Sequence, residues 1–231
     1  MLRDLLRLHP RLECPEETHF FRWADPFSSY RFNVQYRNGK LFSRHRDLDG
    51  IDHAAFFKAF DTVNSKREIA DWYGQEFLRV QGNPDGRWFD KTPQNVYSIL
   101  LISAIYPDAK FVHIHRNPLN VVASLKEGKV IPTQPLRAAI SAWVESAMIL
   151  TQFRQGFSDR LFELPYEAVT TDARASLTRC LTFLEEDPEL LDFSQVEVHK
   201  EKNKYKNILN KAEVEQVKLQ TEPYLSQYGY A

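Results

Sequence analysis

Residues 87–125, RWFDKTPQNVYSILLISAIYPDAKFVHIHRNPLNVVASL, contain one local pattern twice. In the first copy a short apolar run is followed by Lys91, which stands two positions before Pro93. In the second copy a β-like run is followed by Arg116, which stands two positions before Pro118. Proline is favoured at the first helical position, where its missing N–H costs nothing. Each copy therefore predicts a strand, then a cation, then a helix.

Thr92 and Asn117 stand between each cation and its proline, and both residue types cap helices. Helix N-termini attract anions because their backbone N–H groups and dipole face outward. Either cation alone is more often a solvated surface residue. Two such cations, each at the carboxyl end of a predicted strand, favour an anion site, because ligands of open α/β sheets bind at those ends.

The composition is that of a globular protein, with 43% hydrophobic and 26% charged residues among 231. It predicts a single domain over residues 1–231. A net charge of −1 supplies no basic field, so neither nucleic acid nor a membrane is an expected partner. With only two cysteines and no apolar run long enough to cross a bilayer, the chain is expected to be cytoplasmic.

Apolar spacing predicts the main elements and a fold class. Helices are expected over residues 1–8, 51–63, 65–80, 136–155, 171–184 and 212–228. Residues 110–115 and 161–164 are expected as buried strands, and Asn38-Gly39 as a hairpin turn. The lysine-rich residues 195–207 are expected as a solvated loop. Helices that alternate with short strands predict an α/β fold with a parallel sheet.

Several polar residues are candidates for chemistry, and each has an ordinary alternative. Glu17 is either a solvated loop acid or a general base beside the anion site. Ser124 lies eight residues after Arg116 and is either a neutral helix residue or a phosphate ligand. Tyr166 follows a predicted strand and is either a core residue or a ligand contact.

Metal and nucleotide motifs are weak or missing in the sequence. His113 and His115 share one strand face and are more often core residues than ligands. Cys14 with His9 and His19 matches no structural zinc spacing, so no metal is expected. The chain contains neither GxxxxGK[ST] nor GxGxxG, so glycines do not identify a nucleotide site.

The triplet Lys91-Thr92-Pro93, the segment PDAKFVHIHRNPLNVVASL and the segment LPYEAV resemble the superfamily of sulfotransferases that depend on 3′-phosphoadenosine 5′-phosphosulfate (PAPS). Within it, the likeness is to the branch of tyrosylprotein sulfotransferases and their bacterial relatives. The resemblance implies a P-loop-NTPase-like parallel sheet flanked by helices, PAPS as donor and no metal. It also implies a hydroxyl acceptor, which is a peptide tyrosine, a carbohydrate or a small molecule.

The resemblance also implies roles for six residues. Glu17, immediately before Thr18, corresponds to the base, and Lys91 to the lysine that steadies the bridging oxygen and the sulfuryl group. The remaining four correspond to donor-binding positions: Arg116 and Ser124 for the 3′-phosphate, Tyr166 for the nucleotide, and Lys206, more loosely, in a late loop.

The sequence departs from the family pattern in two places. Gly128 stands where family members often carry a basic residue. The first strand and its PRSGTT-type loop, which binds the 5′-phosphosulfate, are expected immediately before Met1 and are not in the sequence. This predicts an N-terminally truncated domain through a misassigned start, a shortened paralogue or, least expected, a substituting segment. Such a chain is expected to be poorly stable and to bind PAPS weakly, because neighbouring strands would expose unpaired edges.

Two rival functions remain open on the sequence alone. One is a non-catalytic truncated paralogue that acts as a binding or interaction protein. The other is a kinase or another nucleotide-dependent transferase. The aromatic residues Phe20, Phe21, Trp23, Phe27 and Tyr30 either line an acceptor pocket or pack in the core. The sequence identifies neither the acceptor nor the oligomeric state.

Overall fold

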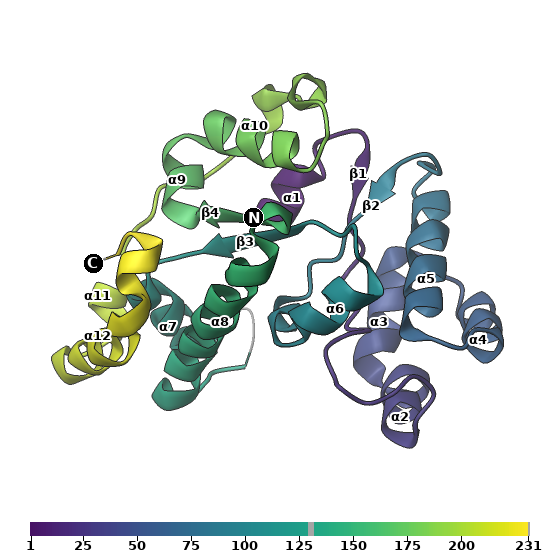
Figure 1. Ribbon diagram of the computed structural model, residues 1–231, viewed down its shortest axis with the longest axis horizontal. Coiled ribbons are helices and arrows are strands. Elements are labelled where there is room, and N and C mark those ends of the chain that lie inside the picture. The colour runs from purple at the N-terminus through teal and green to yellow at the C-terminus, as the bar shows by residue number, and fades with distance from the viewer. Residues whose placement is uncertain (129–131, 231) are drawn as a thin grey trace. The chain divides into compact units, whose positions relative to one another are not determined.

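The computed structural model describes residues 1–128 and 132–230 (Figure 1). The chain divides into two compact units. The first unit consists of Met1–Ala109 and Glu189–Val196, and the second of Lys110–Pro188 and Glu197–Ala231. The single domain over residues 1–231 remains a prediction.

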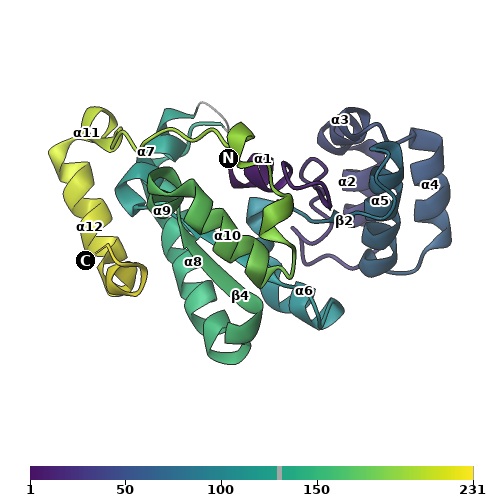
Figure 2. The same cartoon turned by 90° about the horizontal axis from the view of Figure 1, so that it is seen from above.

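The first unit is mainly helical, and α2 to α5 form its bulk (Figure 2). Its elements are α1 (Leu2–Leu6), β1 (Leu12–Glu13), α2 (Tyr30–Asn38), α3 (Lys40–Asp49), α4 (His53–Thr62), α5 (Lys66–Val80), β2 (Arg87–Trp88), the 3₁₀ helix η1 (Pro93–Ser98), α6 (Ile99–Ile105) and the 3₁₀ turn η4 (Phe193–Gln195). Side chains of Ser29, Asp52 and Ser65 cap α2, α4 and α5, as their residue types favour.

The core of the first unit is aromatic. Phe32 and Tyr36 from α2 pack with Phe56 from α4, and with Ile69 and Tyr73 from α5. The helical spacing of these residues explains why the helices predicted over residues 51–63 and 65–80 are confirmed as α4 and α5.

The hairpin predicted at Asn38-Gly39 is wrong, because α2 ends at Asn38 and α3 begins at Lys40. Tyr36 and Phe42 are both buried in the aromatic core, so helical burial overrides the local turn signal. Gly39 is still required there. A Cβ atom at this position would lie 2.1 Å from the carbonyl oxygen of Gln35.

Strands β1 and β2 are parallel, with Leu12 paired to Arg87 and Glu13 paired to Trp88. The pairing extends by one bond, since the Phe89 N–H donates to the Glu13 carbonyl at 2.9 Å. The segments that follow both strands therefore leave from one edge of the pair.

The second unit contains a second pair of parallel strands with helices around it. Its elements are β3 (Phe111–His115), α7 (Pro118–Glu127), α8 (Leu136–Phe157), η2 (Ser158–Arg160), β4 (Leu161–Pro165), α9 (Tyr166–Thr171), α10 (Ala173–Phe183), α11 (Tyr205–Ile208), α12 (Lys211–Leu225) and η5 (Ser226–Tyr228), and η3 (Pro188–Leu190) continues into the first unit. Strand β3 pairs with β4 from Phe111 opposite Leu161 to His115 opposite Pro165. The predicted α/β class with parallel strands is confirmed.

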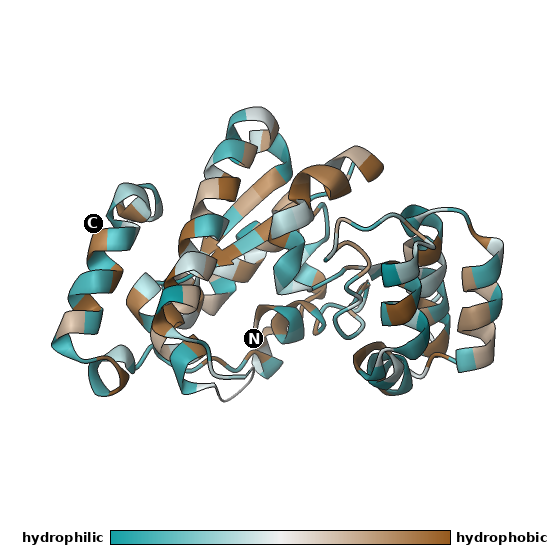
Figure 3. Ribbon diagram, turned by 90° about the horizontal axis from the view of Figure 1, so that it is seen from below, coloured by the Kyte–Doolittle hydropathy of each residue, from teal (hydrophilic) through white to brown (hydrophobic). Residues whose placement is uncertain are grey.

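Helices cover both sides of this strand pair (Figure 1). Helices α9 and α10 pack on β4, while α8 lies on the opposite side. Val122 of α7 and Ile140 of α8 are buried together with Leu209 and Val217, which joins α11 and α12 to the same core. Brown apolar and teal polar residues alternate along the helices, as expected for amphipathic helices that bury one face (Figure 3).

Asn117 caps α7 as the sequence predicts, since its side chain accepts a hydrogen bond from the Leu119 N–H and Pro118 opens the helix. The Asp172 side chain accepts a hydrogen bond from the Ala175 N–H and caps α10. Helix α9 was not predicted. Its six residues span less than two turns, which is too short for apolar periodicity to show.

Candidate functional site

Glu17 and Lys91 meet in the first unit, and their catalytic roles remain predictions. Glu17 follows the end of β1 and Lys91 follows the end of β2, and these strands are parallel neighbours. The Lys91 ammonium donates to Glu17 Oε1 at 2.5 Å. Their side chains are 42% and 25% exposed, so a ligand can reach both groups.

Asp90 holds together the two loops that carry Glu17 and Lys91, and no pattern in the sequence predicts this role. Its carboxylate accepts hydrogen bonds from Thr18 Oγ1 at 3.0 Å, Thr92 Oγ1 at 2.9 Å and Asn95 Nδ2 at 2.8 Å. Burial raises the pKa of Asp90, although these three bonds favour the ionised form. Thr18 directly follows Glu17, and Asp90 directly precedes Lys91. The hydrogen bond between Thr18 and Asp90 therefore connects the loop that carries Glu17 to the loop that carries Lys91.

Thr92 does not cap the following helix as predicted. Its hydroxyl donates to Asp90 instead, and η1 has no side-chain cap. The same Thr92 oxygen accepts from the His19 N–H at 3.4 Å. The Thr92 side chain therefore links the two loops, while η1 begins directly after it at Pro93 without a side-chain cap.

Two histidines surround Glu17. His19 is buried in a left-handed backbone conformation with φ of 57°, and its Nε2 lies 3.4 Å from Glu17 Oε2. The His45 ring stacks on His19 with 5.7 Å between ring centroids, and its Nδ1 lies 2.8 Å from the Glu17 carbonyl oxygen. Burial lowers the pKa of His19 to about 4, although the charge of Glu17 opposes this. His19 is therefore neutral at pH 7.

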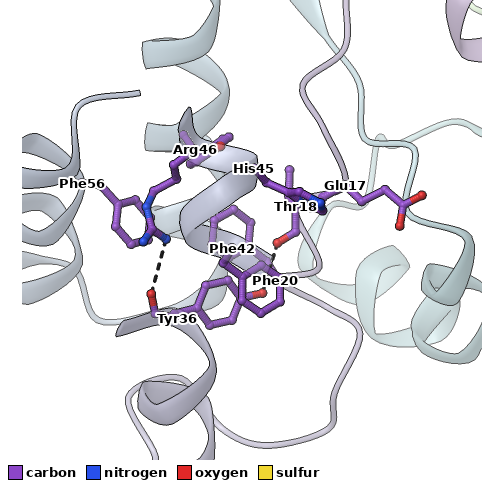
Figure 4. A pocket seen from close by; sticks show the side chains of 9 residues that line it. Glu17, Thr18, Phe20, Tyr36, Phe42, His45, Arg46 and Phe56 are labelled. Carbon is purple, nitrogen blue, oxygen red and sulfur yellow. Dashed lines mark hydrogen bonds between the residues drawn. The ribbon is translucent and has the colours of Figure 1, made fainter. Parts of the chain in front are cut away.

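The aromatic residues behind Glu17 form core rather than an open acceptor pocket (Figure 4). The cavity that they enclose is only about 10 Å³, roughly enough for one water molecule. Tyr36 donates from its hydroxyl to the Thr18 carbonyl at 3.2 Å. Phe20 and Phe21 are buried in the aromatic core, whereas Tyr30 is 83% exposed. Trp23 and Phe27 are half-buried against the same core.

Arg116 and Tyr166 meet in the second unit. They directly follow β3 and β4, whose last residues are paired with each other. The guanidinium carbon of Arg116 lies 4.4 Å above the centre of the Tyr166 ring, which is a cation–π contact. Tyr166 thus supports the flat face of the arginine and leaves its N–H edge available for an anion.

That edge already holds a carboxylate. Arg116 Nε and Nη2 lie 2.6 Å and 2.5 Å from Glu201 Oε2. The Glu201 side chain is only 12% exposed, and its other oxygen accepts from the Asn203 N–H at 2.9 Å. Arg116 therefore binds an oxyanion in this structure, and that oxyanion belongs to the lysine-rich segment.

Ser124 and Lys206 are both exposed on neighbouring helices, α7 and α11. Within residues 1–128 and 132–230, neither side chain forms a hydrogen bond with Arg116. Their predicted roles remain predictions. Over the same residues, no group of three or more His, Cys, Asp or Glu side chains is arranged to hold a metal ion.

Two buried histidines, His19 and His115, predict that the folded protein loses stability in acid. Burial lowers the pKa of His115 in the second unit to about 4, as it does for His19 in the first. An unfolded histidine binds a proton near pH 6.5, so between pH 6.5 and 4 the unfolded chain binds more protons than the folded chain. We expect the free energy of unfolding to fall as the pH is lowered through this window.

Urea denaturation at pH 7.0 and pH 5.0 measures this loss. His115→Asn should reduce the difference between the two pH values, whereas His53→Asn, at an exposed histidine paired with Asp47, should leave it unchanged. Equal pH dependence in all three proteins would contradict the assignment.

The chain matches the family model described as "Sulfotransferase family" over residues 1–189. The protein belongs to the sulfotransferase family. This confirms the resemblance at the level of the superfamily, while the tyrosylprotein branch remains a prediction. The chain is 25% identical over 135 residues to the nodulation protein NoeE of Sinorhizobium fredii. The aligned segment makes up 57% of this chain and 29% of NoeE. The chain thus spans less than a third of that relative's length.

Solved structures of sulfotransferase domains share the fold. The domain from the curacin biosynthetic pathway aligns with a TM-score of 0.64 at 16% identity, over 99% of this chain and 94% of that one. The domain from the Synechococcus PCC 7002 olefin synthase aligns with a TM-score of 0.67 at 22% identity, over 99% and 90%. Among the described residues, no helix combines the length and apolar character needed to span a bilayer.

Proposed function

We propose that this protein transfers a sulfuryl group from PAPS to a hydroxyl-bearing acceptor. Membership of the sulfotransferase family supports a transferase and favours it over a kinase or a non-catalytic binding protein. The observation that carries the proposal is the contact of 2.5 Å between Lys91 Nζ and Glu17 Oε1. It joins an accessible carboxylate to an accessible cation at the carboxyl ends of two parallel strands.

Glu17 and Lys91 have complementary roles in the proposed reaction. Glu17 accepts the proton of the acceptor hydroxyl, whose oxygen forms the new bond to sulfur. The bond between sulfur and the bridging phosphate oxygen breaks, and adenosine 3′,5′-bisphosphate (PAP) leaves. Lys91 stabilises the negative charge that develops on the bridging oxygen. No metal is required for this proton and charge balance.

Arg116 binds the 3′-phosphate in this proposal. Its Nε and Nη2 edge holds the Glu201 carboxylate, and the same fork matches a phosphate. Tyr166 supports the guanidinium and contacts the nucleotide. The exposed Ser124 hydroxyl and Lys206 ammonium are proposed as further donors to the phosphate.

Donor competition tests the proposal. A fluorescent PAP analogue is bound to the 231-residue chain and displaced with PAPS, PAP, ATP or 5′-AMP. PAPS and PAP should displace it at concentrations well below those of ATP and 5′-AMP. Transfer of ³⁵S from PAPS to phenol, tyrosyl peptide or sugar acceptors then tests the reaction. Preferential binding of ATP would reject the donor assignment.

Glu201 should compete with the 3′-phosphate. Because its carboxylate occupies the edge of Arg116, a bound phosphate must displace it. Glu201→Gln removes this charge, and we expect PAP to bind roughly 3- to 10-fold more tightly, the range of one charge-assisted hydrogen bond.

Calorimetric titration with PAP measures this gain. Glu197→Gln makes the same charge change at an exposed position of the same segment and should leave the affinity unchanged. Equal gains in both variants would indicate a general charge effect, and weaker binding by Glu201→Gln would contradict displacement.

A further inference from the structure

The peptide group that joins Arg116 to Asn117 is held on both sides by side chains from other elements. We infer that Trp143, Glu167 and Tyr230 form a peptide clamp that positions Arg116 to bind the 3′-phosphate of the donor. This inference rests on the proposed function. It assigns positioning roles, because the hydrogen bonds of the three side chains go to the peptide group and to one another and not to the guanidinium group.

Two direct hydrogen bonds fix the peptide group. The indole Nε1–H of Trp143, on α8, donates to the Arg116 carbonyl oxygen at 3.1 Å. The Asn117 N–H donates to Glu167 Oε1, on α9, at 3.0 Å. Both polar atoms of one peptide group are thus bound by side chains, at the junction of β3 and α7. This junction sets the direction in which the Arg116 side chain leaves the strand.

Glu167 is held in turn by the C-terminal segment. The Tyr230 hydroxyl donates to Glu167 Oε2 at 2.8 Å, so each carboxylate oxygen of Glu167 has its own donor. His115 Nδ1 lies 3.1 Å from the same Tyr230 oxygen. Because the single hydroxyl proton points to Glu167, His115 must donate from Nδ1. The bonds therefore run in one direction, from His115 through Tyr230 to Glu167.

The surroundings favour this arrangement of protons. Burial, with the hydrogen bond to Glu167, raises the pKa of Tyr230, so its hydroxyl remains a donor at neutral pH. Burial keeps His115 neutral, and its ring packs 4.7 Å from the ring of Tyr228. Trp143 is 8% exposed and packs in the same cluster as Tyr228. The clamp is therefore built into a packed region rather than a solvated loop.

A clamp that acts through Arg116 affects the affinity for some ligands and not for others, whereas a network that only stabilises the fold does not discriminate between ligands. Its loss should weaken ligands that carry a 3′-phosphate and spare those that do not. PAP and 5′-AMP differ only in this phosphate, so the ratio of their affinities reports on Arg116. Thermal unfolding reports separately on stability.

We therefore propose titrating the 231-residue chain and its variants with PAP and with 5′-AMP. Tyr230→Phe should reduce PAP affinity roughly 3- to 10-fold, as expected for one hydrogen bond in a polar chain, and leave 5′-AMP affinity unchanged. Glu167→Ala should lose more than Tyr230→Phe, and Glu167→Gln, which keeps one acceptor oxygen, should recover part of that loss. Tyr224→Phe, a matched hydroxyl deletion on α12, should change neither affinity.

The outcomes separate this inference from the proposed function. If the unmodified chain binds PAP no better than 5′-AMP, the 3′-phosphate assignment of Arg116 fails and the clamp fails with it. If the unmodified chain prefers PAP but Tyr230→Phe and Glu167→Gln weaken both ligands equally, or change only the unfolding temperature, the clamp alone is overturned. A selective loss of PAP affinity in folded variants supports it.

Discussion

Lys91→Ala is expected to slow sulfuryl transfer roughly 100- to 1,000-fold, the usual loss when one group that stabilises developing charge is removed. The affinity for PAPS should change by less than about threefold, because Lys91 acts mainly on charge that appears during the reaction. Single-turnover transfer from ³⁵S-labelled PAPS, with donor affinity measured separately by titration, resolves the two effects.

The ion pair between Lys91 and Glu17 gives Lys91→Ala two opposing effects on the reaction. In the structure Lys91 neutralises Glu17 at 2.5 Å, so the lysine must turn towards the donor before the carboxylate is free to accept a proton. Lys91→Ala frees Glu17 but removes the cation that meets the leaving oxygen, and the second effect should dominate. Lys110→Ala, which breaks a lysine–glutamate pair of 2.8 Å with Glu185, controls for loss of an ion pair. A large loss of PAPS affinity with unchanged turnover would reject the assignment.

The sequence named Glu17, Lys91, Arg116 and Tyr166 as site residues, but it predicted no contact between Glu17 and Lys91 or between Arg116 and Tyr166. Each of these residues follows a strand, and parallel strands bring their carboxyl ends together. The paired strands therefore explain both contacts, although β1 itself was not predicted, because its two residues are too few to show a pattern.

The residues that hold these pairs in place were not predictable in the same way. Glu201 reaches Arg116 from 85 residues away, and Tyr230 reaches Glu167 from 63 residues away. Asp90 is one acidic residue among many until its burial and three donors are known. No motif marks such residues, because their roles arise from the fold and not from local spacing.

The error at Gly39 has the opposite cause. A two-residue turn signal was preferred over the helical spacing of Phe32 and Tyr36, four residues apart on α2, although burial of two large rings outweighs a turn preference. The apolar spacing on α2 was the stronger evidence, and the glycine allows the close approach to the Gln35 carbonyl oxygen instead.

Arg116→Ala is expected to weaken PAP binding roughly 30- to 100-fold, with little effect on 5′-AMP. The loss should be smaller than for an arginine that is free before binding. In the structure Arg116 already holds Glu201, so PAP binding exchanges a carboxylate for a phosphate, and only the difference contributes to affinity. The phosphate gains from its second negative charge and its third oxygen.

Titration with PAP in two backgrounds tests whether Glu201 and the 3′-phosphate share Arg116. In a Glu201→Gln background Arg116 has no carboxylate to release, so Arg116→Ala should cost more there than in the unmodified chain. Arg116→Lys should fall between, because lysine keeps the charge but loses the planar fork. Arg137→Ala, at an exposed position on α8, removes the same charge and should have no effect. Equal losses of PAP affinity in both backgrounds would show that Glu201 and the 3′-phosphate do not share Arg116.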